Sequence, residues 1–125
     1  MKVLHIEDDA DIREIAKVAL EIVGGHELRQ CAEGESAVEA AAEFRPDVFL
    51  IDVNLPRVSG PEILRRIRAL PEVGDAPAIF MTAKALPNEI SELEALGAIG
   101  VIVKPFDPMG LPAQLETMVA RAKEH

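Results

Sequence analysis

The segment Pro46-Asp47-Val48-Phe49-Leu50-Ile51-Asp52 carries the strongest indication of the fold in this chain. Its centre, 48–51, consists of four consecutive apolar residues with no polar residue between them. Such a run is typical of a strand that is covered on both faces, as strands are in parallel sheets. Pro46 ends the helical pattern that precedes the segment. The segment therefore predicts a buried parallel strand that is followed directly by a carboxylate, Asp52.

The same arrangement, a short apolar run followed by a longer amphipathic stretch, occurs five times along the chain. The predicted strands are Val3–Ile6, Glu27–Cys31, Val48–Ile51, Ala78–Met81 and Gly100–Val103. Apolar residues recur at helical spacing in 12–23, 37–44, 63–70, 86–93 and 111–122. Five strand–helix units predict an α/β fold, a five-stranded parallel sheet with helices on both faces, because right-handed crossovers lay the helices against the sheet.

The composition excludes several classes of protein. The chain has 125 residues, with 22 acidic against 13 basic side chains and a formal net charge of −9. This length is sufficient for one domain with a substantial core. The acidic excess disfavours nonspecific binding to nucleic acid or to anionic membranes, which needs a basic surface. Cys31 is the only cysteine, which excludes an internal disulfide and a cysteine-built zinc site. The apolar runs are too short for a signal peptide or a membrane span, so we expect a cytoplasmic protein.

Polar side chains follow four of the predicted strands, at the point where each strand ends. They are Glu7-Asp8-Asp9, Asp52-Val53-Asn54, Thr82-Ala83-Lys84 and Lys104-Pro105. In open α/β sheets the binding crevice lies outside the carboxyl ends of the strands, so these groups are expected to lie close together. Carboxylates at such short distances repel one another unless cations compensate their charge. Lys104 is one such cation, and Mg²⁺, which prefers oxygen ligands, is the second that we expect.

This arrangement also suggests covalent chemistry. An aspartate at the end of a rigid strand and beside a metal can attack phosphorus and hold an acyl phosphate. An ammonium and a metal would screen the charge of the transferring group, and a threonine hydroxyl could donate a hydrogen bond to it. Asp52 is the predicted nucleophile because it directly follows the most buried strand.

Together these residues resemble the receiver domains of two-component response regulators. The resemblance covers essentially the whole chain and rests on five separated motifs. They are Glu7-Asp8, the segment 46–52 with Asn54-Leu55-Pro56 and Ser59-Gly60, Met81-Thr82-Ala83, Gly97-Ala98, and Lys104-Pro105-Phe106. The resemblance implies a flavodoxin-like receiver fold with strand order 2-1-3-4-5 and five helices. We also expect residues 1–125 to form a single receiver domain with no output domain, because no DNA-reading helix and no catalytic segment follows the fifth predicted helix in this sequence; a longer parent chain stays open.

The resemblance assigns a role to each strand-end residue. Asp52 is the expected phosphoacceptor, Thr82 the switch hydroxyl and Lys104 the phosphate-pairing lysine, whose bond to Pro105 is expected to be cis. The expected ligands of Mg²⁺ are the carboxylates of Glu7, Asp8 and Asp52 and the backbone carbonyl of Asn54. By resemblance, the chain is a phosphoacceptor signalling switch that takes a phosphoryl group from a histidine kinase or a histidine phosphotransfer protein. It is expected to catalyse only its own phosphorylation and autodephosphorylation.

The implied output is altered protein–protein binding through the fourth helix, the fifth strand and the fifth helix, with a weak or phosphorylation-dependent dimer as an option. Two positions affect this expectation. Val101 stands where the family has an aromatic switch residue, three positions before Lys104, so no aromatic ring is expected to follow Thr82 inward. Lys84, two positions after Thr82, lies where the family tunes hydrolysis of the acyl phosphate, so Lys84→Ala is predicted to alter dephosphorylation.

Two other functions fit parts of this pattern. An aspartyl-nucleophile phosphohydrolase would need a second aspartate two residues after the first, where this chain has Asn54. A flavodoxin-like nucleotide or flavin binder would need a Gly/Ser/Thr-rich loop after the first strand, where this chain has Glu7-Asp8-Asp9.

Several other polar residues favour structural interpretations. Asp9 fits a helix N-terminus, and His5 a structural histidine in a partly covered strand. Cys31 fits a small buried apolar residue. The basic cluster around the third predicted helix is expected to be mainly a solvated face; it contains Arg57, Arg65, Arg66 and Arg68.

Overall fold

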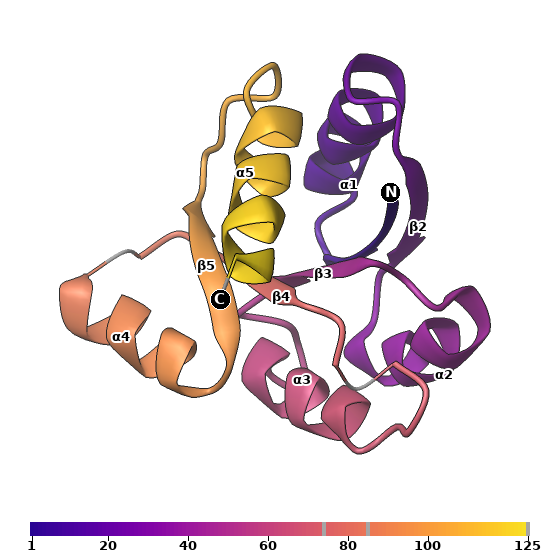
Figure 1. Ribbon diagram of the computed structural model, residues 1–125, viewed down its shortest axis with the longest axis vertical. Helices are drawn as coiled ribbons and strands as arrows, with labels where there is room; N and C mark the ends of the chain where they lie inside the picture. The colour runs from indigo at the N-terminus through magenta and orange to yellow at the C-terminus, as the bar shows by residue number, and fades with distance from the viewer. Residues whose placement is uncertain (74, 85, 125) are drawn as a thin grey trace.

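The computed structural model describes residues 1–73, 75–84 and 86–124 and has one parallel sheet (Figure 1). Its strands are β1 Lys2–Ile6, β2 Glu27–Cys31, β3 Val48–Asp52, β4 Ala78–Thr82 and β5 Ala98–Val103, and their order is β2-β1-β3-β4-β5. The helices are α1 Ala10–Lys17, η1 Val18–Val23, α2 Gly34–Phe44, α3 Gly60–Arg68, α4 Pro87–Ala95 and α5 Leu111–Lys123. The predicted fold class and strand order are confirmed.

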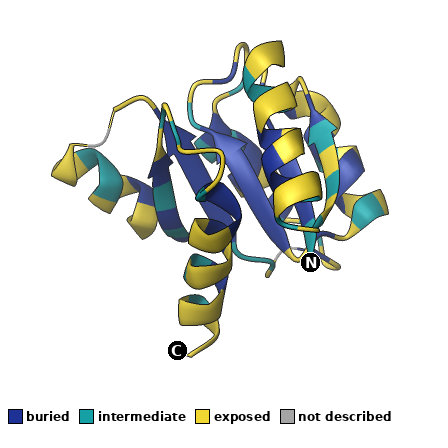
Figure 2. Cartoon of the chain, turned by 90° about the horizontal axis from the view of Figure 1, so that it is seen from above, coloured by how far each residue is buried: buried dark blue, intermediate teal, exposed yellow. Residues whose placement is uncertain are grey.

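The helices cover the sheet in two layers, each with its own apolar core. The core beneath α1, η1 and α5 includes Leu20 and Leu115, together with Val3 of β1. The core beneath α2, α3 and α4 includes Ile63 and Leu93, together with other residues of the same strands. Every residue of β3 and β4 is buried, as expected for central strands covered on both sides (Figure 2). Among the described residues, no helix is long and apolar enough to cross a membrane.

Helix caps fix the chain directly after two of the strand-end loops. The Asp9 carboxylate accepts hydrogen bonds from the backbone amides of Asp11 and Ile12, which starts α1 three residues after β1. The Ser59 hydroxyl accepts from the Glu62 amide and starts α3. These caps leave 7–9 and 53–59 as short connections at the carboxyl edge of the sheet. The N-terminal role predicted for Asp9 is confirmed.

Four details differ from the sequence-based predictions. The helix expected over 12–23 changes to π-helical hydrogen bonding at Val18, which the spacing of apolar residues does not reveal. That stripe is also wider than the buried face, since Ile15 is 45% exposed and Ile22 78%. Leu86, placed in the apolar stripe of the fourth helix, is exposed at the N-cap of α4. Strand β5 begins at Ala98, two residues before the predicted start.

Candidate functional site

Three carboxylates meet where β1 and β3 end. These strands are neighbours, with Ile6 paired to Ile51, so the next residues, Glu7 and Asp52, emerge side by side. Oxygen atoms of Glu7, Asp8 and Asp52 all lie within 4.8 Å of one another. Glu7 and Asp52 are buried, whereas Asp8 is exposed. The cluster is therefore embedded in the sheet on one side and open to solvent on the other.

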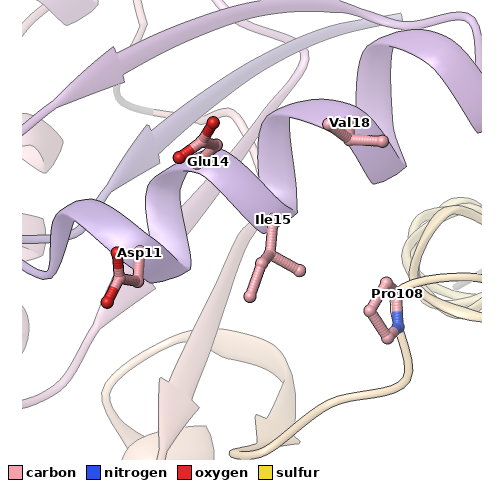
Figure 3. A pocket seen from close by; sticks show the side chains of 5 residues that line it. All are labelled: Asp11, Glu14, Ile15, Val18 and Pro108. Carbon is pink, nitrogen blue, oxygen red and sulfur yellow. The ribbon is translucent and has the colours of Figure 1, made fainter.

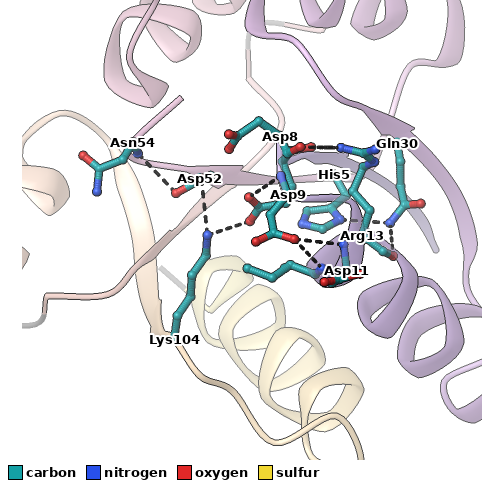
Figure 4. A network of polar contacts seen from close by, with 11 residues as sticks. His5, Asp8, Asp9, Asp11, Arg13, Gln30, Asp52, Asn54 and Lys104 are labelled. Carbon is teal, nitrogen blue, oxygen red and sulfur yellow. Dashed lines mark hydrogen bonds and ion pairs between the residues drawn. The ribbon is translucent and has the colours of Figure 1, made fainter. Parts of the chain in front are cut away.

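Lys104 brings a positive charge to this cluster from the end of β5. Its Nζ lies 2.6 Å from Glu7 Oε1 and 3.3 Å from Asp52 Oδ2 (Figure 4). Its backbone amide donates to the Thr82 carbonyl at 2.8 Å, which ties the lysine to β4. The bond from Lys104 to Pro105 is cis, as expected. The ammonium thus compensates two buried carboxylates.

The electrostatics follow from burial and from this pairing. Burial raises the pKa of Glu7 to about 7, aided by the negative charge of Asp52 and opposed by the hydrogen bond from Lys104. Burial alone would lower the pKa of Lys104, but the carboxylates of Glu7 and Asp52 outweigh it and raise that pKa. Lys104 therefore stays charged at neutral pH, and burial makes the Glu7 carboxyl a weaker acid than an exposed glutamate.

The donor set fits Mg²⁺. This ion binds oxygen atoms at about 2.0–2.1 Å in an octahedron, so its ligand oxygens lie about 3 Å apart in cis and about 4 Å in trans. Carboxylate oxygens within 4.8 Å of one another need only a small inward movement to reach these separations. The Asn54 amide donates to Asp52 Oδ1 at 3.2 Å, which holds the turn after β3 beside the same cluster.

Thr82 and Lys84 border the cluster on the α4 side. Thr82 is buried at the end of β4, and its hydroxyl accepts a hydrogen bond from the Lys84 amide at 3.1 Å. The exposed Lys84 side chain, Asn54 and Thr82 line a cavity of about 400 Å³ that reaches α4. Val101 is half-buried opposite Phe80 and packs against the core beneath α2, α3 and α4. The structure thus gathers Glu7, Asp8, Asp52 and Lys104 in one cluster. Asn54, Thr82 and Lys84 lie along the bordering cavity, and Val101 lies in the adjoining core.

Sequence reasoning missed two residues beside the acidic loop. The Arg13 side chain extends from α1 to the backbone of that loop, and the Gln30 side chain extends from β2 to Arg13 (Figure 4). No spacing rule points to these contacts, because they depend on how α1 packs against β2.

The residues expected to be structural mostly are. His5 is structural, but it is fully buried rather than partly covered, because α1 closes over its strand; burial lowers its pKa to about 3, and the Lys104 charge contributes. Cys31 is buried, and burial raises its pKa. Arg65 and Arg66 form exposed ion pairs with Glu62.

The other two arginines, Arg57 and Arg68, do not lie on a solvated helix face as predicted. Arg57 lies in the loop before α3, with a φ of 69°, rather than on the helix. Arg68 is half-buried and donates to the Ala76 carbonyl. The four arginines therefore do not form one solvated face.

An apolar groove borders the site on the α1 side. One hollow of about 540 Å³ is lined by Asp11, Glu14, Ile15, Val18 and Pro108 (Figure 3). A second hollow of about 320 Å³ shares Ile15 and Pro108 with the first and reaches Lys104. The groove therefore runs from the outer surface of α1 to the lysine beside the acidic cluster.

Comparison with known proteins agrees with this geometry. A family model of the response regulator receiver domain matches residues 3–116. The phosphate regulon transcriptional regulatory protein PhoB of Pseudomonas aeruginosa is 39% identical over 123 residues, covering 95% of this chain and 52% of that protein. Chemotaxis protein CheY-3 of Vibrio cholerae is 31% identical over 121 residues, covering 97% of this chain and 93% of that protein. The chain spans about half the length of PhoB and of two further transcriptional regulators to which it is similar.

Solved structures give the same result. Vibrio cholerae CheY4 superposes with a TM-score of 0.87 at 32% identity, covering 94% of this chain and 97% of that one. The receiver domain of sensor histidine kinase PA1611 from Pseudomonas aeruginosa, which has magnesium in its active site cleft, gives 0.83 at 28% identity and covers 95% and 97%. These matches do not favour a phosphohydrolase or a nucleotide or flavin binder. The chain belongs to the response regulator receiver domain family, the phosphoacceptor signalling switches of two-component systems.

Proposed function

We propose that Asp52 is the phosphoacceptor of this receiver domain and that Glu7, Asp8, Asp52 and the Asn54 carbonyl hold Mg²⁺ beside it. The observation that carries this proposal is the position of Asp52. Its carboxylate is buried at the end of the central strand, shares a cluster with Glu7 and Asp8, and lies 3.3 Å from the Lys104 ammonium. A carboxylate surrounded in this way has both a fixed direction of attack and cations to screen the incoming group.

The chain's own residues perform the transfer as follows. A carboxylate oxygen of Asp52 attacks the phosphorus of a phosphohistidine; the new P–O bond forms as the P–N bond breaks, and the imidazole leaves. Lys104 pairs with the transferred phosphoryl oxygens, and the Thr82 hydroxyl donates a hydrogen bond to one of them. Mg²⁺ held by Glu7, Asp8, Asp52 and the Asn54 carbonyl would add positive charge beside that group. Attack of water on the same phosphorus later restores the carboxylate and releases phosphate, so the chain catalyses only reactions of its own aspartyl group.

The signal leaves the site by way of α4, β5 and α5. The added charge changes the interactions of Thr82 and Lys104, which terminate β4 and β5, and α4 packs against β5. A partner protein, or a second copy of the phosphorylated chain, then binds this face differently. Val101 lacks an aromatic ring, so no ring rotates together with Thr82 in this proposal.

The test is incubation with Mg²⁺ and acetyl phosphate, followed by intact-mass measurement. One added phosphoryl group is expected on the wild type and none on Asp52→Asn. Asp47→Asn is the matched control, because Asp47 precedes the same strand at the opposite edge of the sheet and is expected to leave labelling unchanged. Labelling of Asp52→Asn would overturn the assignment of the acceptor. Equal labelling of the wild type in EDTA would overturn the metal site.

A further inference from the structure

A partly buried hydrogen-bond network connects three elements beside the acidic loop. It consists of His5 on β1, Gln30 on β2 and Arg13 on α1, and it ends at the backbone of Glu7 and Asp8 (Figure 4). The transfer described above uses none of the three side chains.

Arg13 holds the backbone of both acidic residues with one nitrogen. Its Nη1 donates to the Glu7 carbonyl at 2.8 Å and to the Asp8 carbonyl at 2.9 Å. A guanidinium nitrogen has two N–H groups, so one nitrogen can serve both acceptors. The contact fixes two consecutive peptide units, from which one buried and one exposed carboxylate project into the candidate metal site.

Gln30 in turn holds the turn of α1 that carries Arg13. Its Nε2 lies 2.8 Å from the Arg13 carbonyl and 3.1 Å from His5 Nδ1. The carbonyl can only accept, so the nitrogen of the Gln30 amide must face it, and its second N–H is directed to an unprotonated Nδ1. His5 is the register partner of Gln30 across β1 and β2 and is fully buried, so this end of the network is anchored in the sheet.

We propose that Arg13 is a positioning residue for the metal site and that Gln30, anchored by His5, positions Arg13. The inference rests on the proposed function, since it assumes that Glu7 and Asp8 hold Mg²⁺. Mg²⁺ tolerates little departure from octahedral geometry. Residues that orient metal ligands typically change metal affinity by roughly 10–100-fold when they are replaced.

Position and charge predict opposite effects of replacing Arg13. The guanidinium repels a divalent cation, so if only its charge mattered, its removal would tighten Mg²⁺ binding. If its contacts position Glu7 and Asp8, removal weakens binding. The sign of the change therefore separates the two explanations.

The experiment is isothermal titration calorimetry, in which MgCl₂ is added to the purified chain at constant ionic strength. Arg13→Gln removes the charge, and Arg13→Lys keeps the charge but loses the planar fork. Both variants are expected to bind Mg²⁺ more weakly, with a Kd that is roughly tenfold higher or more. Arg121→Gln, which removes an exposed arginine near the far end of α5, is the charge control and is expected to bind as the wild type does. Arg13→Gln binding Mg²⁺ as tightly as the wild type, or more tightly, would overturn the proposal, as would unchanged affinity in Arg13→Lys.

If the Arg13 variants do not fold, which urea unfolding in EDTA would detect, a second variant tests the same network. Gln30→Ala leaves Arg13 in place and is expected to weaken the Kd by less, in the same direction; an unchanged Kd would count against the network. The acetyl phosphate reaction supplies an independent readout. In Arg13→Lys the Mg²⁺ concentration that gives half the maximal rate is expected to rise, with little change in the rate at saturating Mg²⁺. A lower saturated rate with an unchanged Mg²⁺ requirement would contradict a positioning role.

The two proposals fail in different ways. A wild type that binds no Mg²⁺ overturns the proposed metal site, and this inference with it. A wild type that binds Mg²⁺ and is labelled on Asp52, with Arg13 variants that do the same at equal Mg²⁺, overturns only the role of Arg13.

Discussion

His5 and Glu7 lie two residues apart on the same chain segment and respond to pH in opposite directions. Burial lowers the pKa of His5 from 6.5 to about 3, so folding favours its neutral form. The stabilisation from His5 is complete above pH 6.5 and is lost as pH falls toward 3. Burial raises the pKa of Glu7 from 4.5 to about 7, which also favours a neutral form. The stabilisation from Glu7 is complete below pH 4.5 and is lost as pH rises through 7.

Between pH 4.5 and 6.5 the two effects oppose each other, and single variants are expected to separate them. Relative to the wild type, the free energy of unfolding of Glu7→Gln is expected to rise with pH in this window, and that of His5→Val to fall. Each slope is at most about 1.4 kcal/mol per pH unit, the value for one proton. The measurement is urea unfolding in EDTA at several pH values, with circular dichroism as the probe. Parallel profiles for the wild type and both variants would contradict the assigned protonation states.

Lys84 lies on the α4 side of the proposed phosphorylation site. Its side chain lines the cavity that Asn54 and Thr82 share, so its removal opens a path for water to the acyl phosphate. Lys84→Ala is expected to shorten the half-life of the phosphorylated chain several-fold, as measured by intact mass after removal of acetyl phosphate. Lys123→Ala, an exposed lysine at the end of α5, is the control. An unchanged half-life in Lys84→Ala would refute the role of this side chain.

At the scale of the elements, the loop between β3 and α3 contains a strained residue. Arg57 is exposed and has a φ of 69°, a conformation that costs a residue with a Cβ atom roughly 1–2 kcal/mol. Glycine relieves this strain but loses more backbone entropy on folding. Arg57→Gly is therefore expected to stabilise the protein by about 0.5–1 kcal/mol in urea unfolding. Arg57→Ala keeps the Cβ atom and is expected to be close to neutral; equal effects of the two variants would show that strain is not the cause.

The elements also show what local sequence can predict. The predicted bounds of β3 and β4 agree with the structure to within one residue. In each strand, four consecutive apolar residues follow a proline, and a run that is apolar on both faces is typical of a strand covered on both sides. The start of β5 was missed because half-buried Ile99 is flanked by the small residues Ala98 and Gly100, which give a weak pattern. The change to π-helix at Val18 was missed because it depends on hydrogen bonding, which side-chain spacing does not encode.

At the scale of the whole molecule, topology accounts for why the candidate site could be predicted. In a parallel sheet all strands end at one edge, so residues distant in sequence, such as Glu7, Asp52 and Lys104, must meet there. Arg13 and Gln30 could not be predicted, because their roles depend on side chains that turn back from a helix and an edge strand. The formal net charge of −9 likewise concealed a division between surface acids and a compensated buried cluster.

Within the part of the chain that the structure describes, the two apolar cores on opposite faces of the sheet share no side chain, since successive residues of each strand point to different faces. Arg13, which contacts the acidic loop, lies on the α1 and α5 side, whereas α4, proposed to carry the signal, lies on the other side. Substitutions that repack one face are therefore nearly additive with those on the other. The α4 part of the proposed signalling face therefore lies apart from the layer that supports the acidic loop, whereas α5 belongs to that layer. Chimaeras that exchange α4 between relatives are expected to change this part of the face without repacking the supporting layer.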